Sequence, residues 1–171
     1  QGVYIPFWLY SGNCEGSITA EGINTRTWTS ENYRYTEKKY YSVYRNGTLD
    51  FKAVPVDASS KTDDDAMDSI EPFDYSEMTA FNPGYLSGYL AERYDEDKDK
   101  CLPRAKERIE NTTRDELRNT CNYNSVNVQS YEKHTEIKDV KYAMLPTWLL
   151  YTTYQDKPYF FAMNGQTGKF I

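Results

Sequence analysis

The chain has 171 residues, about one domain's length at roughly 100–200 residues per domain, and 17 of them are tyrosine. It carries 20 lysines and arginines against 26 aspartates and glutamates, and this net charge of −6 argues against a protein that works by neutralising the phosphates of a duplex. Hydrophobic residues make up 39% of the chain, which is enough for a core and excludes disorder throughout.

The first part of the chain, residues 3–56, is predicted to form strands. Its β-branched and aromatic residues lie between turn signals at Ser11–Asn13, Glu21–Gly22 and Arg45–Gly47. This pattern predicts a meander of short strands, with a tight hairpin turn at Asn46–Gly47.

The middle of the chain is predicted to hold an acidic loop at 57–71 and two helices within about 82–121. The loop has no apolar periodicity. The first helix is expected to begin after the capping residue Asn82, with Pro83 as its first helical residue. The second is expected from about Asp99 to Cys121, where apolar residues recur at helical spacing.

The last part, residues 125–171, returns to strands. A long apolar strand at Val140–Tyr154 is predicted to pair with Lys157–Met163 across Gln155 and Asp156, and Asn164–Gly168 to turn the chain into a final strand. Strands at both ends and helices between them predict an α+β fold with an antiparallel sheet and a central two-helix insertion, in a single domain over 1–171.

A short sequence pattern occurs in both strand regions. Ile5–Tyr10 and Leu145–Tyr151 both begin with an apolar residue and proline, followed by any residue, tryptophan and leucine. Either two buried strands coincide by chance, or the copies lie side by side with Trp8 and Trp148 in a shared core.

Carboxylates are concentrated in the predicted acidic loop. Hard oxygen ligands suit calcium or magnesium, but the spacing does not match an EF-hand loop. The sequence favours a solvated loop, and the alternative is a divalent-cation site. The candidate ligands of that site are Asp57, Asp63, Asp64, Asp65 and Asp68.

No catalytic constellation is visible. The three cysteines form no CxxC pair for zinc, and their odd number and wide spacing indicate a reducing compartment. His134 has no nucleophile to serve, and Gly165–Lys169 lacks the spacing of a phosphate-binding loop. The sequence therefore predicts a protein that is not an enzyme, with no cofactor in this chain.

An exposed aromatic platform is the main candidate for recognition. Trp28, Tyr40 and Tyr44 could present large rings to a peptide or a sugar. Alternatively they cover a sheet edge or meet the helices. Most of the other tyrosines are expected to fill half-buried sheet faces and the apolar stripe of the first helix.

Four stretches carry a resemblance to a known group of proteins. They are YIPFWLY at Tyr4–Tyr10, DSIEPFDYSE at Asp68–Glu77, YLSGYLAE at Tyr85–Glu92 and AMNGQTGK at Ala162–Lys169. They look like an uncharacterised family of Gram-positive bacterial proteins in which a zinc ribbon precedes this domain and a membrane segment follows it. The closing hairpin is also similar to those of cystatin-like and PepSY-like modules, so the fold could hold two such halves.

The resemblance implies context rather than chemistry. It implies a membrane-anchored parent on the cytoplasmic side of the cell membrane, with zinc only in a ribbon outside this chain. The leading hypothesis is a non-enzymatic domain that binds a protein or peptide, with no nucleic acid bound and no membrane entered by this chain alone. The alternatives are a nucleic-acid-linked, helicase-labelled protein acting through the ribbon, and a carbohydrate-binding domain.

Overall fold

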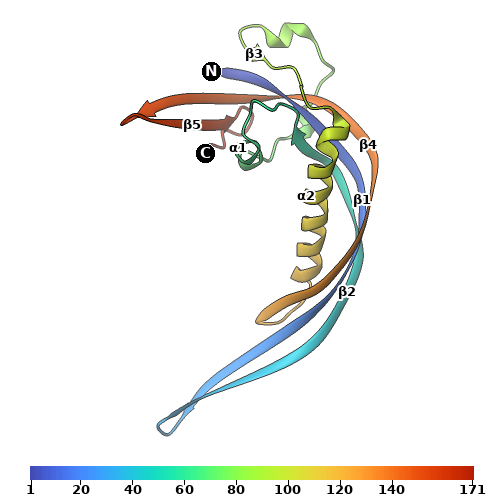
Figure 1. Ribbon diagram of the computed structural model, residues 1–171, viewed down its shortest axis with the longest axis vertical. Helices are drawn as coiled ribbons and strands as arrows, with labels where there is room; N and C mark the ends of the chain where they lie inside the picture. Colours follow the sequence, from blue (N-terminus) through green and yellow to red (C-terminus); the bar gives the residue numbers. More distant parts are fainter. The chain divides into compact units, whose positions relative to one another are not determined.

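The computed structural model describes all residues 1–171 (Figure 1). In chain order it contains β1 (Gly2–Ser30), β2 (Tyr33–Asp57), α1 (Asp64–Ser69), two short 3-10 helices (Tyr75–Glu77 and Pro83–Leu86), β3 (Leu90–Ala91), α2 (Lys98–Asn119), β4 (Ser125–Tyr154) and β5 (Lys157–Asn164). The strands form one sheet in the order β2-β1-β4-β5, and β3 adds a short parallel pair to β1. The predicted α+β class with an antiparallel sheet is confirmed.

The hairpin of β4 and β5 forms as predicted. The two strands pair antiparallel from Thr147 opposite Asn164 to Tyr154 opposite Lys157 (Figure 1). Gln155 and Asp156 make the turn with positive φ angles of 49° and 60°, which is the geometry of a two-residue hairpin turn. The predicted final turn also forms, since Phe170 returns to bridge Met163.

The predicted meander of short strands is wrong, because β1 and β2 are long and joined by one turn at Glu31 and Asn32. Gly12 and Gly22, which the sequence marks as turns, lie inside β1, and the tight hairpin turn predicted at Asn46–Gly47 does not form because both residues lie inside β2. A Cβ on Gly12 would come within 2.0 Å of the carbonyl oxygen of Glu136, and one on Gly22 within 2.6 Å of the Tyr123 ring. These glycines serve close approach of neighbouring groups instead of chain reversal.

Two predictions for the middle of the chain are also wrong. The expected helix after Asn82 is a single 3-10 turn at Pro83–Leu86, capped by the Asn82 side chain, and Gly88 follows with a φ of +85°. The expected acidic loop contains the helix α1, whose first turn is capped by the Asp63 carboxylate, 2.9 Å from the Ala66 nitrogen. The second predicted helix forms as α2.

Contacts divide the chain into two compact units, each assembled from segments distant in sequence. Unit 1 comprises Gln1–Ser11, Lys52–Ala105 and Asp139–Ile171, and unit 2 comprises Gly12–Phe51 and Lys106–Lys138. That the 171 residues make a single domain stays a prediction.

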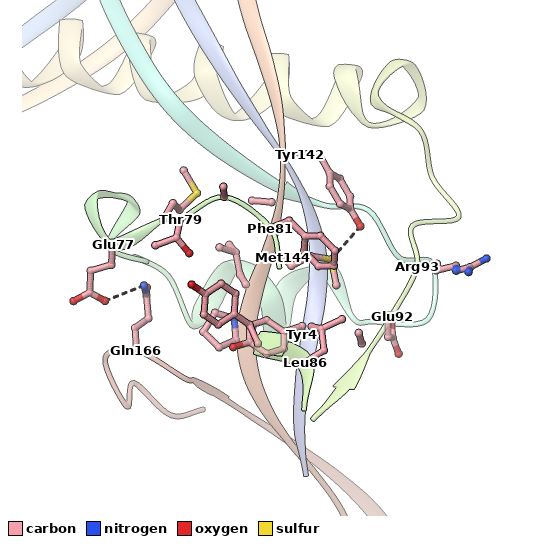
Figure 2. A pocket seen from close by; sticks show the side chains of 17 residues that line it. Tyr4, Glu77, Thr79, Phe81, Leu86, Glu92, Arg93, Tyr142, Met144 and Gln166 are labelled. Atoms are coloured by element: carbon pink, nitrogen blue, oxygen red, sulfur yellow. Dashed lines mark hydrogen bonds between the residues drawn. The ribbon is translucent and has the colours of Figure 1, made fainter. Parts of the chain in front are cut away.

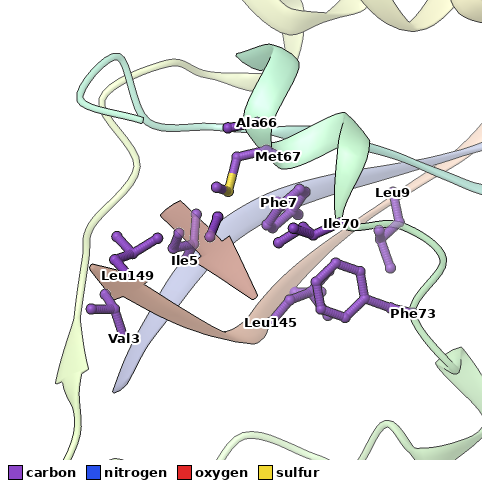
Figure 3. Packing of buried hydrophobic residues seen from close by; sticks show 12 residues of the cluster. Val3, Ile5, Phe7, Leu9, Ala66, Met67, Ile70, Phe73, Leu145 and Leu149 are labelled. Atoms are coloured by element: carbon purple, nitrogen blue, oxygen red, sulfur yellow. The ribbon is translucent and has the colours of Figure 1, made fainter. Parts of the chain in front are cut away.

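The core of unit 1 lies between one face of the sheet and α1 (Figure 3). Alternate residues of β1, from Val3 to Leu9, point to this face beside Leu145 and Leu149 of β4. The helix α1 and the residues after it close the core with Met67, Ile70 and Phe73. Unit 2 has its own smaller cluster, formed by Ile18, Ala20, Val43, Leu117 and Cys121.

Most of the tyrosines do not occupy half-buried positions as predicted. Only Tyr10 among the 17 tyrosines is buried, and twelve are exposed. The two copies of the repeated pattern do lie on neighbouring strands, β1 and β4, and the Gln1 nitrogen donates to the Leu149 oxygen at 2.8 Å. The alternative of a shared tryptophan core is wrong, however, because Trp8 packs on Tyr94 and Tyr142, whereas Trp148 is 45% exposed.

Candidate functional site: an aromatic cavity

The second face of the unit 1 sheet is lined by aromatic residues that a long connecting segment partly covers. Strand alternation directs Tyr4 and Trp8 away from the core that Val3 and Leu9 enter. The segment between α1 and α2 lies over this face, with the Tyr89 ring 5.6 Å from that of Tyr4. The pairing of β3 with β1, in which Leu90 lies opposite Val3 and Ala91 opposite Tyr4, attaches the segment to the sheet.

A cavity of about 780 Å³ lies between this segment and the sheet (Figure 2). Its volume falls within the roughly 300–1,000 Å³ of ligand pockets. Tyr4, Phe81 and Met144 are among the residues that line it (Figure 2). The apolar lining consists of Tyr4, Met78, Ala80, Phe81, Tyr85, Leu86, Ala91, Tyr142, Ala143, Met144, Leu145 and Pro146.

The walls of the cavity are unusually exposed for large apolar side chains. Phe81 is 67% exposed and Tyr85 57%, and most residues of the segment around them are exposed as well. Such contiguous apolar surface is uncommon on monomeric proteins and marks binding sites. The two methionines, Met78 and Met144, add flexible side chains that adapt to ligands of different shapes.

Several polar groups at the rim are bonded within the protein. The Gln166 Nε2 atom donates to Glu77 Oε2 at 3.3 Å, and Glu92 Oε2 accepts from the Ser59 hydroxyl at 2.8 Å. The Tyr142 hydroxyl donates to the Met144 sulfur at 3.0 Å, and burial, followed by the neighbouring Tyr94, raises its pKa. The cavity therefore offers apolar surface and a few rim hydrogen bonds, and it holds no nucleophile next to a base.

The acidic residues predicted as cation ligands are organised by Arg104. Its Nη1 atom lies 2.6 Å from Asp57 Oδ1 and 2.7 Å from Asp64 Oδ1, and its Nη2 atom lies 2.8 Å from Asp68 Oδ1. The guanidinium thus occupies the centre of this cluster. Asp63 caps α1, Asp65 is exposed, and no group of three or more histidine, cysteine or acidic side chains is placed to hold a metal ion.

Asp57 gives a testable pH dependence. Burial raises its pKa to about 6, although Arg104 acts in the opposite direction, and the nearby Asp64 carboxylate adds to the rise. The folded state then holds a proton that the unfolded state has released, so the contribution of Asp57 to stability falls between about pH 4 and pH 6. We expect the difference in unfolding free energy between the native chain and Asp57→Asn to fall across this window in urea titrations. A difference that is flat or rises with pH would contradict the assignment.

The predicted aromatic platform is not brought together. Trp28 stacks on Tyr35 with ring centroids 5.6 Å apart, on the face of the strands that also carries Val43. Tyr40 and Tyr44 are exposed on the opposite face. Any binding role for these three residues stays a prediction.

Sequence reasoning missed the cavity because it assigned Phe81 and Tyr85 to the apolar stripe of a helix. The four-residue spacing of Phe81, Tyr85 and Tyr89 is real, but a glycine, Gly84 or Gly88, precedes each of the two tyrosines. Those glycines were the available signal that the segment is an extended, aromatic-rich connection and not a helix.

One comparison with known proteins gives a match. The chain is 37% identical over 171 residues to the uncharacterised protein YdjG of Bacillus subtilis (strain 168), an alignment that covers 99% of this chain and 50% of YdjG. The chain therefore spans about half the length of this curated relative. No protein-family model matches, and no solved structure matches.

The match confirms the likeness to an uncharacterised protein of a Gram-positive bacterium, and it assigns no function. The zinc ribbon, the membrane segment and the cystatin-like or PepSY-like halves stay predictions. None of the helices combines the length and apolar character needed to cross a membrane.

Proposed function

We propose that unit 1 is a peptide-binding module, and that its cavity receives a bulky apolar side chain from an extended segment of a protein partner. The observation that carries this proposal is the exposure of Phe81 and Tyr85 on the wall of an apolar cavity of about 780 Å³. Aromatic and methionine side chains are enriched in protein interfaces, and tryptophan and tyrosine are enriched among the residues that contribute most to binding.

The composition of the cavity favours a peptide over the other ligand classes that the sequence left open. Arg93 is the one cationic residue on the lining, and Figure 2 places its side chain pointing away from the cavity. A nucleic acid would need several cations for its phosphates. The rim offers few free polar groups for the hydroxyls of a sugar, since Gln166, Glu77 and Glu92 are bonded within the protein.

The test is a selection of peptides from a random library on the 171-residue chain, followed by affinity measurements. We expect the selected peptides to share an aromatic residue, leucine or methionine at one position. We expect Phe81→Ala to weaken their binding about 10–30-fold, the effect of removing an interface anchor worth about 1.4–2 kcal/mol. Fluorescence anisotropy with labelled peptides measures this change.

A matched pair of tyrosine variants controls for general loss of aromatic surface. Tyr85 lines the cavity and is 57% exposed, whereas Tyr154 lies at the end of β4 and is 65% exposed. We expect Tyr85→Ala to weaken binding and Tyr154→Ala to leave it unchanged. Equal affinity of the Phe81 and Tyr85 variants with the native chain, or selected peptides without a common apolar residue, would overturn the proposal.

We also propose that the protein is non-enzymatic and acts on the cytoplasmic side of the cell membrane. The location is supported by the three cysteines, which are buried and free, and by the resemblance described above. Zinc would then belong to a ribbon outside this chain.

A further inference from the structure

The outer edge of β2 over Tyr33–Phe51 is a second surface with the features of a recognition site, and this part of the strand lies in unit 2. In the sheet order β2 has β1 as its one neighbour, so its other edge carries a row of backbone N–H and C=O groups without a strand partner. Between Tyr33 and Tyr44 every side chain except Val43 is exposed. A long edge of this kind is a template for an additional strand.

The hairpin that carries this edge is basic, although the chain as a whole is acidic. Residues 24–45 contain five basic and two acidic side chains, a local charge of +3 in a chain of −6. The cations are Arg26, Arg34, Lys38, Lys39 and Arg45. Arg34 and Lys38 are exposed, and the structure gives neither of them an ion pair.

We propose that the β2 edge binds an acidic peptide segment in extended conformation, as an added strand. Backbone hydrogen bonds would supply the pairing, and the cations would select acidic residues at alternate positions of the peptide. This surface is independent of the cavity in unit 1, so either proposal can fail without the other.

The charge pattern argues for an acidic partner over a second copy of the chain. Pairing β2 with another β2 would bring two hairpins of charge +3 together, and like charges opposite each other destabilise a sheet. Edge lysines are also a common protection against self-association. The positive charge of the hairpin therefore opposes pairing with a second copy and favours pairing with an acidic strand.

Aromatic rings are available to both faces of an added strand. Tyr40 and Tyr44 lie on the face that Arg34 and Lys38 share by strand alternation, and both tyrosines are about 60% exposed. The opposite face carries the stacked pair of Trp28 and Tyr35, with the Arg26 guanidinium 5.6 Å from the Trp28 ring centroid. Alternate side chains of a bound strand would meet cations and rings on either side.

The experiment compares two labelled peptides of the same length on the full chain, one alternating glutamate with valine and one alternating glutamine with valine. We expect the glutamate peptide to bind at least about tenfold more tightly, and its binding to weaken as salt is raised. Amide chemical shifts should change along Tyr33–Tyr44, as expected for strand addition at β2.

Charge-reversal variants test whether Arg34 and Lys38 bind the acidic peptide. We expect the double variant Arg34→Glu/Lys38→Glu to lose at least about tenfold in affinity for the glutamate peptide. The control double variant Lys141→Glu/Lys157→Glu makes the same charge change on exposed residues of unit 1 and should retain the native affinity.

Several outcomes would overturn the proposal. They are equal affinity for the two peptides, full affinity in the Arg34 and Lys38 variant, and shift changes confined to residues outside β2. Sedimentation that shows a dimer lost in this variant would assign the edge to a second copy instead. Binding of anionic vesicles in competition with the peptide, without strand-like shifts, would assign the cations to a lipid surface.

Discussion

Replacing Arg104 by methionine is expected to lower the free energy of unfolding by about 3 kcal/mol near neutral pH. Removing one partner of a buried ion pair costs about 3–5 kcal/mol, because the remaining charge is left buried. The lower end applies here, since the Arg104 side chain keeps 24% exposure while Asp57 keeps 1%. Urea denaturation of the native and variant chains measures the difference.

A second arginine on α2 provides the control. Arg114 pairs with its neighbour Asp115 at 3.1 Å on an exposed helix face. Arg114→Met makes the same chemical change and is expected to cost less than about 0.5 kcal/mol. The Arg104 effect should also shrink at about pH 4.5, where Asp57 is protonated in the native chain. Equal costs for the two variants would show that the cluster around Asp57 does not stabilise unit 1.

The second large effect is expected at Asn164, at the end of β5. Its side chain is fully buried, and its Nδ2 atom donates to the carbonyl oxygens of Ile70 and Pro72, both at 3.0 Å. Its Oδ1 atom accepts from the backbone nitrogens of Gln166 at 2.8 Å and Thr167 at 3.0 Å. One side chain thus joins the end of α1 to the final turn.

Asn164→Ala is expected to destabilise the protein by on the order of 2–4 kcal/mol, because buried partner groups are left unsatisfied at about 1–3 kcal/mol each. Asn164→Asp keeps both acceptor bonds but turns a carboxylate oxygen toward the Ile70 and Pro72 carbonyls. We therefore expect the aspartate variant to be at least as unstable as the alanine variant near pH 7, and to recover as the carboxyl is protonated at low pH. Thermal denaturation across pH tests this order, and a stable aspartate variant near pH 7 would contradict it.

The parts of the fold that the sequence predicted are those set by local chemistry. The pairing of β4 with β5 follows from two alternating segments separated by two turn residues, and the final turn follows from Asn164, Gly165 and Gly168. The helix α2 follows from apolar residues at helical spacing. In each case the signal and the structure that it specifies lie within about twenty residues of each other.

The features that the sequence did not predict depend on contacts between distant residues. The local sequence around Gly12 and Gly22 is typical of turns, and the reason that these residues lack a side chain is the close approach of Glu136 and Tyr123, which are more than 100 residues away. Asp57 and Arg104 are 47 residues apart, so the sequence could list the carboxylates but not the guanidinium that neutralises them. Phe81 and Tyr85 have helical spacing, yet they form the wall of a cavity over the sheet.

The most direct test of the cavity as a peptide site uses the four methionines of the chain. Met78 and Met144 line the cavity, Met67 is buried in the core of unit 1, and Met163 lies on β5. With ¹³C-labelled methionine methyl groups, titration with a library-selected peptide should shift the signals of Met78 and Met144 along one saturable curve. The signals of Met67 and Met163 should stay in place, and Phe81→Ala should abolish the shifts. A peptide that binds with full affinity while Met78 and Met144 do not move would contradict the assignment of this cavity as the binding site.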